Sequence, residues 1–172
     1  IRTRPGHELI MANYHAVNEE HFRKWSPSMP KDHHTIESWK LRLKEQELLF
    51  ENDRSVHFIG SDETESHVIG SCSISSIVRG VFQACYMGYS VAERFEGQGK
   101  MKLIVSEVID YAFIELKLHR IMANYMPSNE RSGKLLESLG FEKEGLAKDY
   151  LYINGKWEDH VMTALLNRNH RF

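Results

Sequence analysis

The sequence has few cysteines, few prolines and no long uncharged hydrophobic run. Its 2 cysteines among 172 residues are too few for a disulfide framework or a four-cysteine metal site. Its 4 prolines and 11 glycines exclude collagen-like and low-complexity chains. The longest charge-free stretches, residues 66–78 and 81–92, are both too short, and together too rich in serine, glycine and tyrosine, to span a bilayer. A globular domain without a membrane span is therefore expected.

The charge is nearly balanced, with 22 basic and 24 acidic residues and a formal net charge of -2. A dedicated nucleic-acid-binding domain normally carries a large basic excess, so direct binding of nucleic acid is not expected. No apolar segment of a signal peptide follows Arg2 and Arg4, which favours a cytoplasmic location. The length and even composition suit a single domain over residues 1–172, and they leave monomer and homodimer both open.

Hydrophobic periodicity predicts an α+β fold with a mixed, mostly antiparallel sheet. Apolar residues at helical spacing predict a helix from Ile36 to Phe50, capped by Asp32 or Thr35, and a later helix with Leu103 on its apolar face. Gly140 should end another helix, and residues 154–155, Asn-Gly, predict a tight hairpin. The expected helices cover residues 15–25, 36–50, 100–118 and 128–139, and the expected strands 9–11, 55–60, 65–78, 82–91, 119–126, 149–153 and 157–166.

A glycine loop at residues 94–100, Arg-Phe-Glu-Gly-Gln-Gly-Lys, lies between an expected strand and an expected helix. Such a loop can offer free main-chain N–H groups at a helix N-terminus, where anions bind. It is not a dinucleotide fingerprint, because Lys102 stands where the third glycine belongs, and it is not a Walker A loop, because Arg94 and Met101 occupy required positions. A plain strand-to-helix turn remains the alternative.

The loop pattern R-x-x-G-x-G resembles motif A of the GNAT acetyltransferases, and a second match to that family follows downstream. The second match consists of Asn129, Ser132, Leu135 and the pair Gly140-Phe141. The stretches RGVFQACYMGYS, HRIMANYMPSNERSGKLLESLGFEKEG and DYLYINGKWEDHVMTALL are similar to those of the ribosomal-protein-alanine N-acetyltransferases. Within that group the likeness is greatest to the type that modifies the fifth small-subunit ribosomal protein, and it covers residues from about 8 to 166.

The resemblance implies a GNAT fold, in which the central strand splays from its neighbour, and a site for acetyl-CoA. The splay is expected near Tyr89 to Val91, where main-chain groups would pair with the pantetheine arm. The phosphates would bind the N–H groups at the start of the following helix, and Lys100 would add positive charge. The cofactor-binding residues implied in this way are Tyr89, Ser90, Val91, Glu96, Gly97, Gln98, Gly99, Lys100, Met101 and Asn129.

The reaction implied is direct attack of a peptide α-amine on the thioester carbonyl, in a ternary complex. The acceptor would be the N-terminal alanine of a ribosomal protein, and a main-chain N–H near Val91 would stabilise the oxyanion. Many family members carry a tyrosine acid seven residues after the motif asparagine, but this chain has Leu136 there. Ser132 is the remaining candidate to protonate the leaving thiolate, although a serine at a helix start also bonds local main chain.

Several other side chains leave two interpretations open. No carboxylate can be assigned as the base, and Glu93, Glu96 and Asp149 are possible. Trp25 and Tyr150 are candidates to line the acceptor groove, with helix-end and cross-strand packing as the alternatives. Cys85 is expected in the core rather than as an acyl carrier.

The histidines show no metal-ligand spacing, so no metal site is expected. Two other functions stay open. One is acetylation of another small amine, such as a polyamine or an antibiotic. The other is a non-catalytic acyl-CoA-binding role in ribosome assembly.

Overall fold

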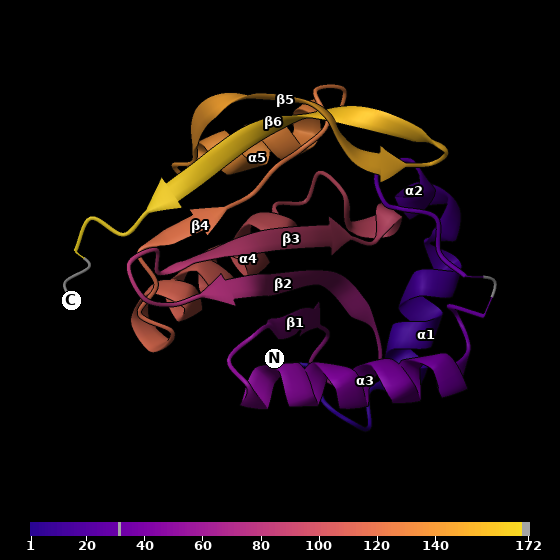
Figure 1. The fold of residues 1–172 in the computed structure, drawn as a ribbon. Coiled ribbons are helices and arrows are strands. Elements are labelled where there is room, and N and C mark those ends of the chain that lie inside the picture. Colours follow the sequence, from indigo (N-terminus) through magenta and orange to yellow (C-terminus); the bar gives the residue numbers. More distant parts are fainter. Residues whose placement is uncertain (31, 170–172) are drawn as a thin grey trace.

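A computed structural model describes residues 1–30 and 32–169. These residues form one six-stranded sheet and its flanking helices (Figure 1). The strand order is β1-β2-β3-β4-β6-β5, and every neighbouring pair is antiparallel except β3 with β4. The strands are β1 (Val56–Ser61), β2 (Val68–Val78), β3 (Ala84–Val91), β4 (Arg120–Met122), β5 (Glu142–Ile153) and β6 (Lys156–Leu166). The helices are α1 (Glu8–Val17), α2 (Glu19–Arg23), α3 (Ile36–Glu51), the 3-10 turn η1 (Glu93–Phe95), α4 (Lys100–Asp110), the π-helical turn η2 (Tyr111–Glu115) and α5 (Glu130–Ser138). The predicted α+β class with a mostly antiparallel mixed sheet is confirmed.

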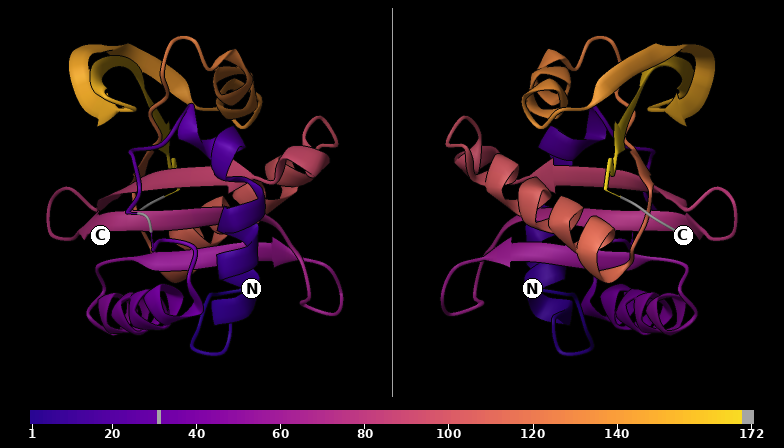
Figure 2. Two further views of the ribbon diagram at one scale, coloured as in Figure 1. Left: turned by 90° about the vertical axis from the view of Figure 1, so that its right-hand side faces the viewer. Right: turned by 90° about the vertical axis from the view of Figure 1, so that its left-hand side faces the viewer.

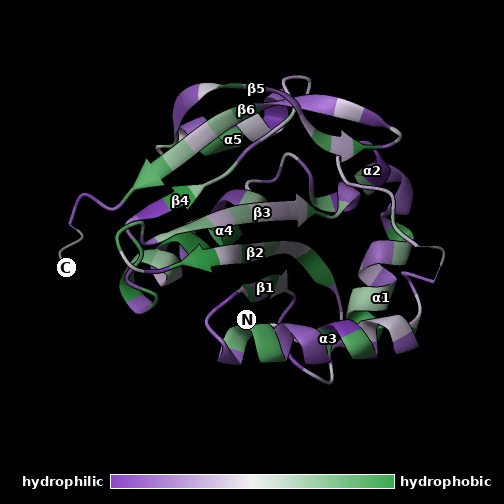
Figure 3. Cartoon of the chain, in the orientation of Figure 1, coloured by the Kyte–Doolittle hydropathy of each residue, from purple (hydrophilic) through white to green (hydrophobic). Residues whose placement is uncertain are grey.

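Helices cover both faces of the sheet. In the left view of Figure 2, α1 lies in front of the strands and α4 behind them, and the right view shows the reverse. One core cluster joins the sheet to α4 and α5, and it includes Val105, Ile121 and Leu136. A second, smaller cluster joins α1 and α3 to β1 and β2 around Leu43 and Ile59. In Figure 3 the C-terminal ends of β2 and β6 have the colour of hydrophobic residues, and these ends contribute to the larger core. Among the described residues, no helix has both the length and the apolar character that crossing a membrane requires.

The sheet opens where β3 leaves β4. The two strands pair in parallel only from Ala84 with Arg120 to Tyr86 with Met122. Beyond Tyr86, β3 continues to Val91 beside β2, whereas the chain after β4 follows β6 through bonds from Ala123 and Tyr125. The predicted splay of the central strand is therefore confirmed, and it begins just after Tyr86.

Three predicted local signals appear as expected. The Thr35 hydroxyl accepts a hydrogen bond from the Ser38 N–H at 3.1 Å and caps α3. Gly140 follows α5 with a φ of +87°, a left-handed conformation that suits glycine. Asn154 and Gly155 have φ values of +48° and +90°, the pair of positive values that a type I′ hairpin turn needs.

Other boundaries differ from the sequence prediction. Residues 9–11 belong to α1 and not to a strand, because Met11 and Tyr14 bury one side of a helix against the smaller core. The helix expected over residues 15–25 is split between α1 and α2. Leu103 is 70% exposed, so its expected place on the buried face of α4 was wrong. The strand expected from residue 149 begins at Glu142, because β5 pairs with β6 along most of its length despite two bulges.

Candidate active site

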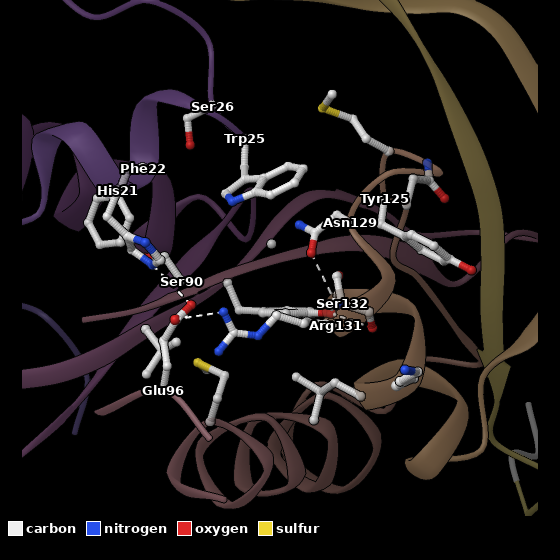
Figure 4. Close-up of a pocket in the computed structure, with 18 of the residues that line it drawn as sticks. His21, Phe22, Trp25, Ser26, Ser90, Glu96, Tyr125, Asn129, Arg131 and Ser132 are labelled. Atoms are coloured by element: carbon white, nitrogen blue, oxygen red, sulfur yellow. Dashed lines mark hydrogen bonds and ion pairs between the residues drawn. The ribbon is translucent and has the colours of Figure 1, made fainter. Parts of the chain in front are cut away.

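A cavity of about 660 Å³ lies in the opening between β3 and the β5–β6 hairpin (Figure 4). Its walls come from the α2 end, β3, the glycine loop, the chain after β4, α5 and the hairpin. The lining residues are His21, Phe22, Trp25, Ser26, Pro27, Met87, Gly88, Tyr89, Ser90, Val91, Phe95, Glu96, Gly97, Gly99, Met101, Lys102, Asn124, Tyr125, Met126, Asn129, Arg131, Ser132, Lys134, Leu135, Leu151, Ile153 and His160. This volume falls in the range of ordinary small-molecule sites.

The glycine loop presents unused main-chain donors at the start of α4. Gly97 and Gly99 have φ values of +70° and +73°, and an added side chain would meet no atom within 4 Å at either position. Within the described chain, no acceptor pairs with the N–H groups of residues 97–101. The N–H of Glu96 is different, since it donates to the Glu93 carbonyl at 3.1 Å. The anion cradle therefore begins at Gly97, and the expected contribution of the Glu96 N–H was wrong.

The basic side chains near the cradle are not those that the loop sequence indicated. Lys102, Arg131 and Lys134 line the cavity. Lys100 does not line it, and its ammonium lies 5.2 Å from the centre of the Phe95 ring. The Gln98 side chain also turns away, donating to the Arg94 carbonyl at 2.8 Å. Lys100 and Gln98 can therefore contribute through their main-chain N–H groups, while positive side-chain charge comes from α4 and α5.

The open edge of β3 presents the main chain of alternate residues. The Ala92 N–H bonds the Ile69 carbonyl, so the antiparallel alternation turns the main-chain groups of Tyr89 and Val91 away from β2 and toward the opening. Ser90 has the opposite orientation, and its main chain faces β2. Its hydroxyl lies 2.9 Å from each of the Tyr14 and Ser71 hydroxyls. Of these three predicted cofactor residues, Tyr89 and Val91 present main-chain groups to the opening, whereas Ser90 lines the cavity without presenting its main chain.

Asn129, Ser132 and Tyr89 are joined by hydrogen bonds. The Asn129 side-chain oxygen accepts from the Ser132 N–H at 3.2 Å, which caps α5 and leaves the amide NH₂ of Asn129 as a donor at the cavity (Figure 4). The Ser132 and Tyr89 hydroxyls are 2.7 Å apart. Burial raises the pKa of Tyr89 to about 12, against the opposing effect of its hydrogen bond with Ser132, so both hydroxyls keep their protons at neutral pH.

An ionic bridge crosses the cavity at Glu96. Its carboxylate contacts the Arg131 guanidinium at 2.6 Å and the His21 imidazole at 3.3 Å, and Figure 4 shows the three side chains converging from the loop, α5 and α2. Among the described lining residues, Glu96 is the one carboxylate. The other two candidate bases lie elsewhere: Glu93 faces a separate small pocket beside α1, and the Asp149 N–H bonds the Asp159 carboxylate on β6.

Trp25 lines the cavity as predicted, from the turn after α2, whereas Tyr150 does not. The Tyr150 hydroxyl accepts a hydrogen bond from the Asn124 amide at 3.5 Å, and its ring lies 5.5 Å from that of His160. Tyr150 therefore lies behind two lining residues, because the bulge between Ala147 and Leu151 changes the alternation of β5. Leu151 takes the place at the wall that Tyr150 was expected to hold.

The sequence did not identify His160, Asn124 or Tyr125 as site residues. Tyr125 packs on α5 so closely that a side chain at Gly133 would lie 2.8 Å from its ring. That glycine, inside a helix that otherwise has good helix formers, was a readable sign of a close neighbour. No feature of the neighbouring sequence indicates that His160 lies at the site, because β6 comes beside the cavity through its pairing with β4 and β5.

The two cysteines are buried and play no part in the cavity. Cys85 is 0% exposed and belongs to the larger core, and burial raises the pKa of its thiol to about 12. A thiol held in this form is a poor nucleophile, so its predicted core role is confirmed. Within residues 1–30 and 32–169, no three His, Cys, Asp or Glu side chains come together as metal ligands.

The comparisons with known proteins agree with one another. The acetyltransferase (GNAT) domain family matches residues 4–142. The "[Ribosomal protein uS5]-alanine N-acetyltransferase" of Escherichia coli (strain K12) is 43% identical over 155 residues, which cover 90% of this chain and 80% of that protein.

Two solved structures show the same arrangement. The ribosomal-protein-S5-alanine acetyltransferase from Vibrio fischeri superposes with a TM-score of 0.97 at 40% identity, covering 100% of this chain and 94% of that one. Mycobacterium smegmatis RimJ in complex with CoA-disulfide gives a TM-score of 0.88 at 27% identity, covering 95% of this chain and 78% of that one.

Proposed function

We propose a function from one premise, that this chain belongs to the GNAT family of acetyltransferases. It transfers an acetyl group from acetyl-CoA to the N-terminal α-amine of a ribosomal protein that begins with alanine. The small-subunit protein uS5 is the favoured acceptor, because relatives that carry that name are similar over nearly the whole chain. The reaction takes place in the cytoplasm, and it requires no contact with nucleic acid.

The main observation that supports this proposal is the opening beside β3. It lies between the unused N–H groups of the glycine loop and the hydrogen-bonded hydroxyls of Tyr89 and Ser132. The N–H groups of residues 97–101 and the side chains of Lys102, Arg131 and Lys134 fit the phosphates of coenzyme A. The edge groups of Tyr89 and Val91 and the amide of Asn129 fit the amides of the pantetheine arm. We call this part the cofactor end of the cavity.

The opposite part, the acceptor end, is formed by Trp25, Ser26, Leu151 and His160. Acetyl-CoA supplies a thioester-activated acetyl group, and the chain's residues hold the peptide amine in line with it. The Val91 N–H, turned toward the opening, stabilises the negative charge that develops on the thioester oxygen. The Ser132 hydroxyl donates a proton to the departing sulfur, and the Tyr89 hydroxyl 2.7 Å away orients it.

A polyamine acceptor suits this cavity less well. A polyamine carries several positive charges and needs carboxylates that are free to pair with them. The one lining carboxylate of the described chain, Glu96, is already paired with Arg131 and His21. A peptide has one amino terminus to bury, and the remainder of its tail can stay outside the cavity.

The proposal is tested with labelled acetyl-CoA and three acceptors offered separately. These are a peptide with the N-terminal sequence of uS5 and an internal lysine, the same peptide with a blocked N-terminus, and spermidine. Label on the first peptide alone is the expected result. Label on the blocked peptide or on spermidine, with none at the free N-terminus, would overturn it. Binding of coenzyme A without turnover on any acceptor would instead support the non-catalytic role.

A further inference from the structure

His160 is a buried histidine on the wall of the acceptor end. It lies on β6, is 5% exposed and lines the cavity. Its neighbour Val161 packs against the larger core, on the side of α4 and α5. Since successive strand residues point to opposite faces, the His160 side chain is directed to the other face, where α1 and the Ser90–Tyr14 contact lie. His160 therefore approaches the opening from the side opposite Ser132 and the glycine loop.

The His160 ring is held in one orientation and one tautomer. Its Nδ1 lies 3.0 Å from the Glu158 carbonyl oxygen. A carbonyl only accepts hydrogen bonds, so Nδ1 carries the hydrogen and Nε2 of the neutral ring carries a lone pair. In the described structure Nε2 has no protein partner, yet it is not among the buried unpaired nitrogens, so this atom of a cavity-lining residue is accessible. The Tyr150 ring supports the imidazole from behind, with ring centres 5.5 Å apart.

The other proton acceptors at the cavity are engaged or are held beside the glycine loop. Glu96 is held by Arg131 and His21, and that contact occupies Nε2 of the His21 ring. Glu93 and Asp149 do not line the cavity. The Tyr89 phenol keeps its proton, because burial raises its pKa to about 12. Among the described residues assigned to the acceptor end, His160 is therefore the basic group with a free lone pair, whereas His21 is held through its Nε2 at the Glu96 carboxylate.

We propose that His160 is the general base that removes a proton from the acceptor α-amine, an inference that rests on the proposed function. The peptide nitrogen forms a C–N bond to the acetyl carbon and becomes positively charged. His160 Nε2 takes one proton from that nitrogen. The C–S bond breaks, its electron pair goes to sulfur, and sulfur receives the Ser132 proton. The proton on the imidazolium returns to the Ser132 oxygen through solvent, so one proton moves in total from nitrogen to sulfur.

The test replaces the base and leaves the cavity shape nearly unchanged. In His160→Gln we expect kcat with the alanine peptide to fall by about 100-fold or more, the usual contribution of a general base. The KM for acetyl-CoA should stay unchanged, because His160 lies away from the cofactor end. The matched control is His67→Gln, an exposed histidine in the β1–β2 turn, which should behave as wild type.

A second variant distinguishes a base from a structural residue. In His160→Ala, added imidazole should restore part of the lost kcat, whereas a loss caused by misfolding would not respond. Wild-type kcat in His160→Gln, or no imidazole rescue in a His160→Ala protein that still binds coenzyme A, would overturn the assignment. Wild-type turnover on the alanine peptide reports separately on the proposed function, so the two failures are distinguishable.

Discussion

The cofactor end of the cavity comes from β3 and two short continuous segments, residues 97–102 and 129–134, whereas the acceptor end is assembled from the turn after α2 and from the β5–β6 hairpin. At the cofactor end the groups proposed to bind are mainly main-chain N–H groups, fixed by glycines and by helix starts. At the acceptor end they are side chains that tertiary packing brings together. A sequence motif can encode the first kind of site, and only the folded sheet creates the second.

The largest expected effect is at the cofactor end. Gly97→Glu places a carboxylate in the anion cradle, at a φ of +70°. We expect acetyl-CoA affinity to fall on the order of 1,000-fold, about 4 kcal/mol, because of charge repulsion and the lost main-chain geometry. Titration calorimetry measures it. The control is Gly80→Glu, which has the same φ of +70° in the exposed β2–β3 turn and leaves the cavity unchanged. Equal affinity in folded Gly97→Glu would remove the loop from the site.

The second largest expected effect separates catalysis from cofactor binding at the cofactor end. Ser132→Ala removes the hydroxyl that contacts Tyr89, and we expect kcat to fall on the order of 100-fold with little change in coenzyme A affinity. Ser138→Ala on the same helix is the control, since its hydroxyl bonds the Leu135 carbonyl and lies away from the cavity. A Ser132→Ala enzyme with wild-type kcat would leave the serine with only its helix-start role.

Acid should weaken the packing of α1 against α3, because a buried histidine cluster lies between them. His33 is 2% exposed, with its Nε2 3.4 Å from Nδ1 of His15, and His15 stacks on Trp39 at 4.9 Å. Burial is the main cause that lowers the pKa of His33 to about 4 and of His15 to about 3, with nearby Arg42 adding to it. Both rings stay neutral in the folded chain while the unfolded chain takes up protons below about pH 6.5.

Stability should therefore be complete above pH 6.5 and fall toward pH 4, by about 2 kcal/mol at pH 5 for His33 alone. Urea unfolding at pH 7.5 and pH 5 measures this loss. It should be smaller in His33→Gln and unchanged in the control His67→Gln. The same acid loss in His33→Gln as in wild type would show that the cluster is not its source.

The smallest effect is on peptide binding. Trp25→Ala should raise the KM for the peptide about 10-fold, about 1.4 kcal/mol, because an aromatic wall of the acceptor end is lost. Acetyl-CoA affinity should not change. Trp157→Ala, at an exposed tryptophan of the hairpin outside the cavity lining, is the control. A change in acetyl-CoA affinity and not in peptide KM would assign Trp25 to the wrong end.

The same contrast explains how far the sequence could predict the molecule. Three local features are determined by neighbours in the chain, and the structure has the backbone geometry predicted for each. They are the Thr35 cap, the Asn154-Gly155 turn and the loop containing Gly97. Tyr150 was misplaced because a bulge in β5 changes which side chains face the cavity. His160 could not be found, because its position depends on the pairing of β6 with strands far away in sequence.

The divergence of β3 from β4 places an unpaired strand edge inside a sheet. On the outside of a protein such an edge is a template for another chain and a route to aggregation. Here the hairpin on one side and α2 on the other restrict access to it (Figure 1). Because these walls flank it, the unpaired edge of β3 is not an open template on the outer surface of the described sheet.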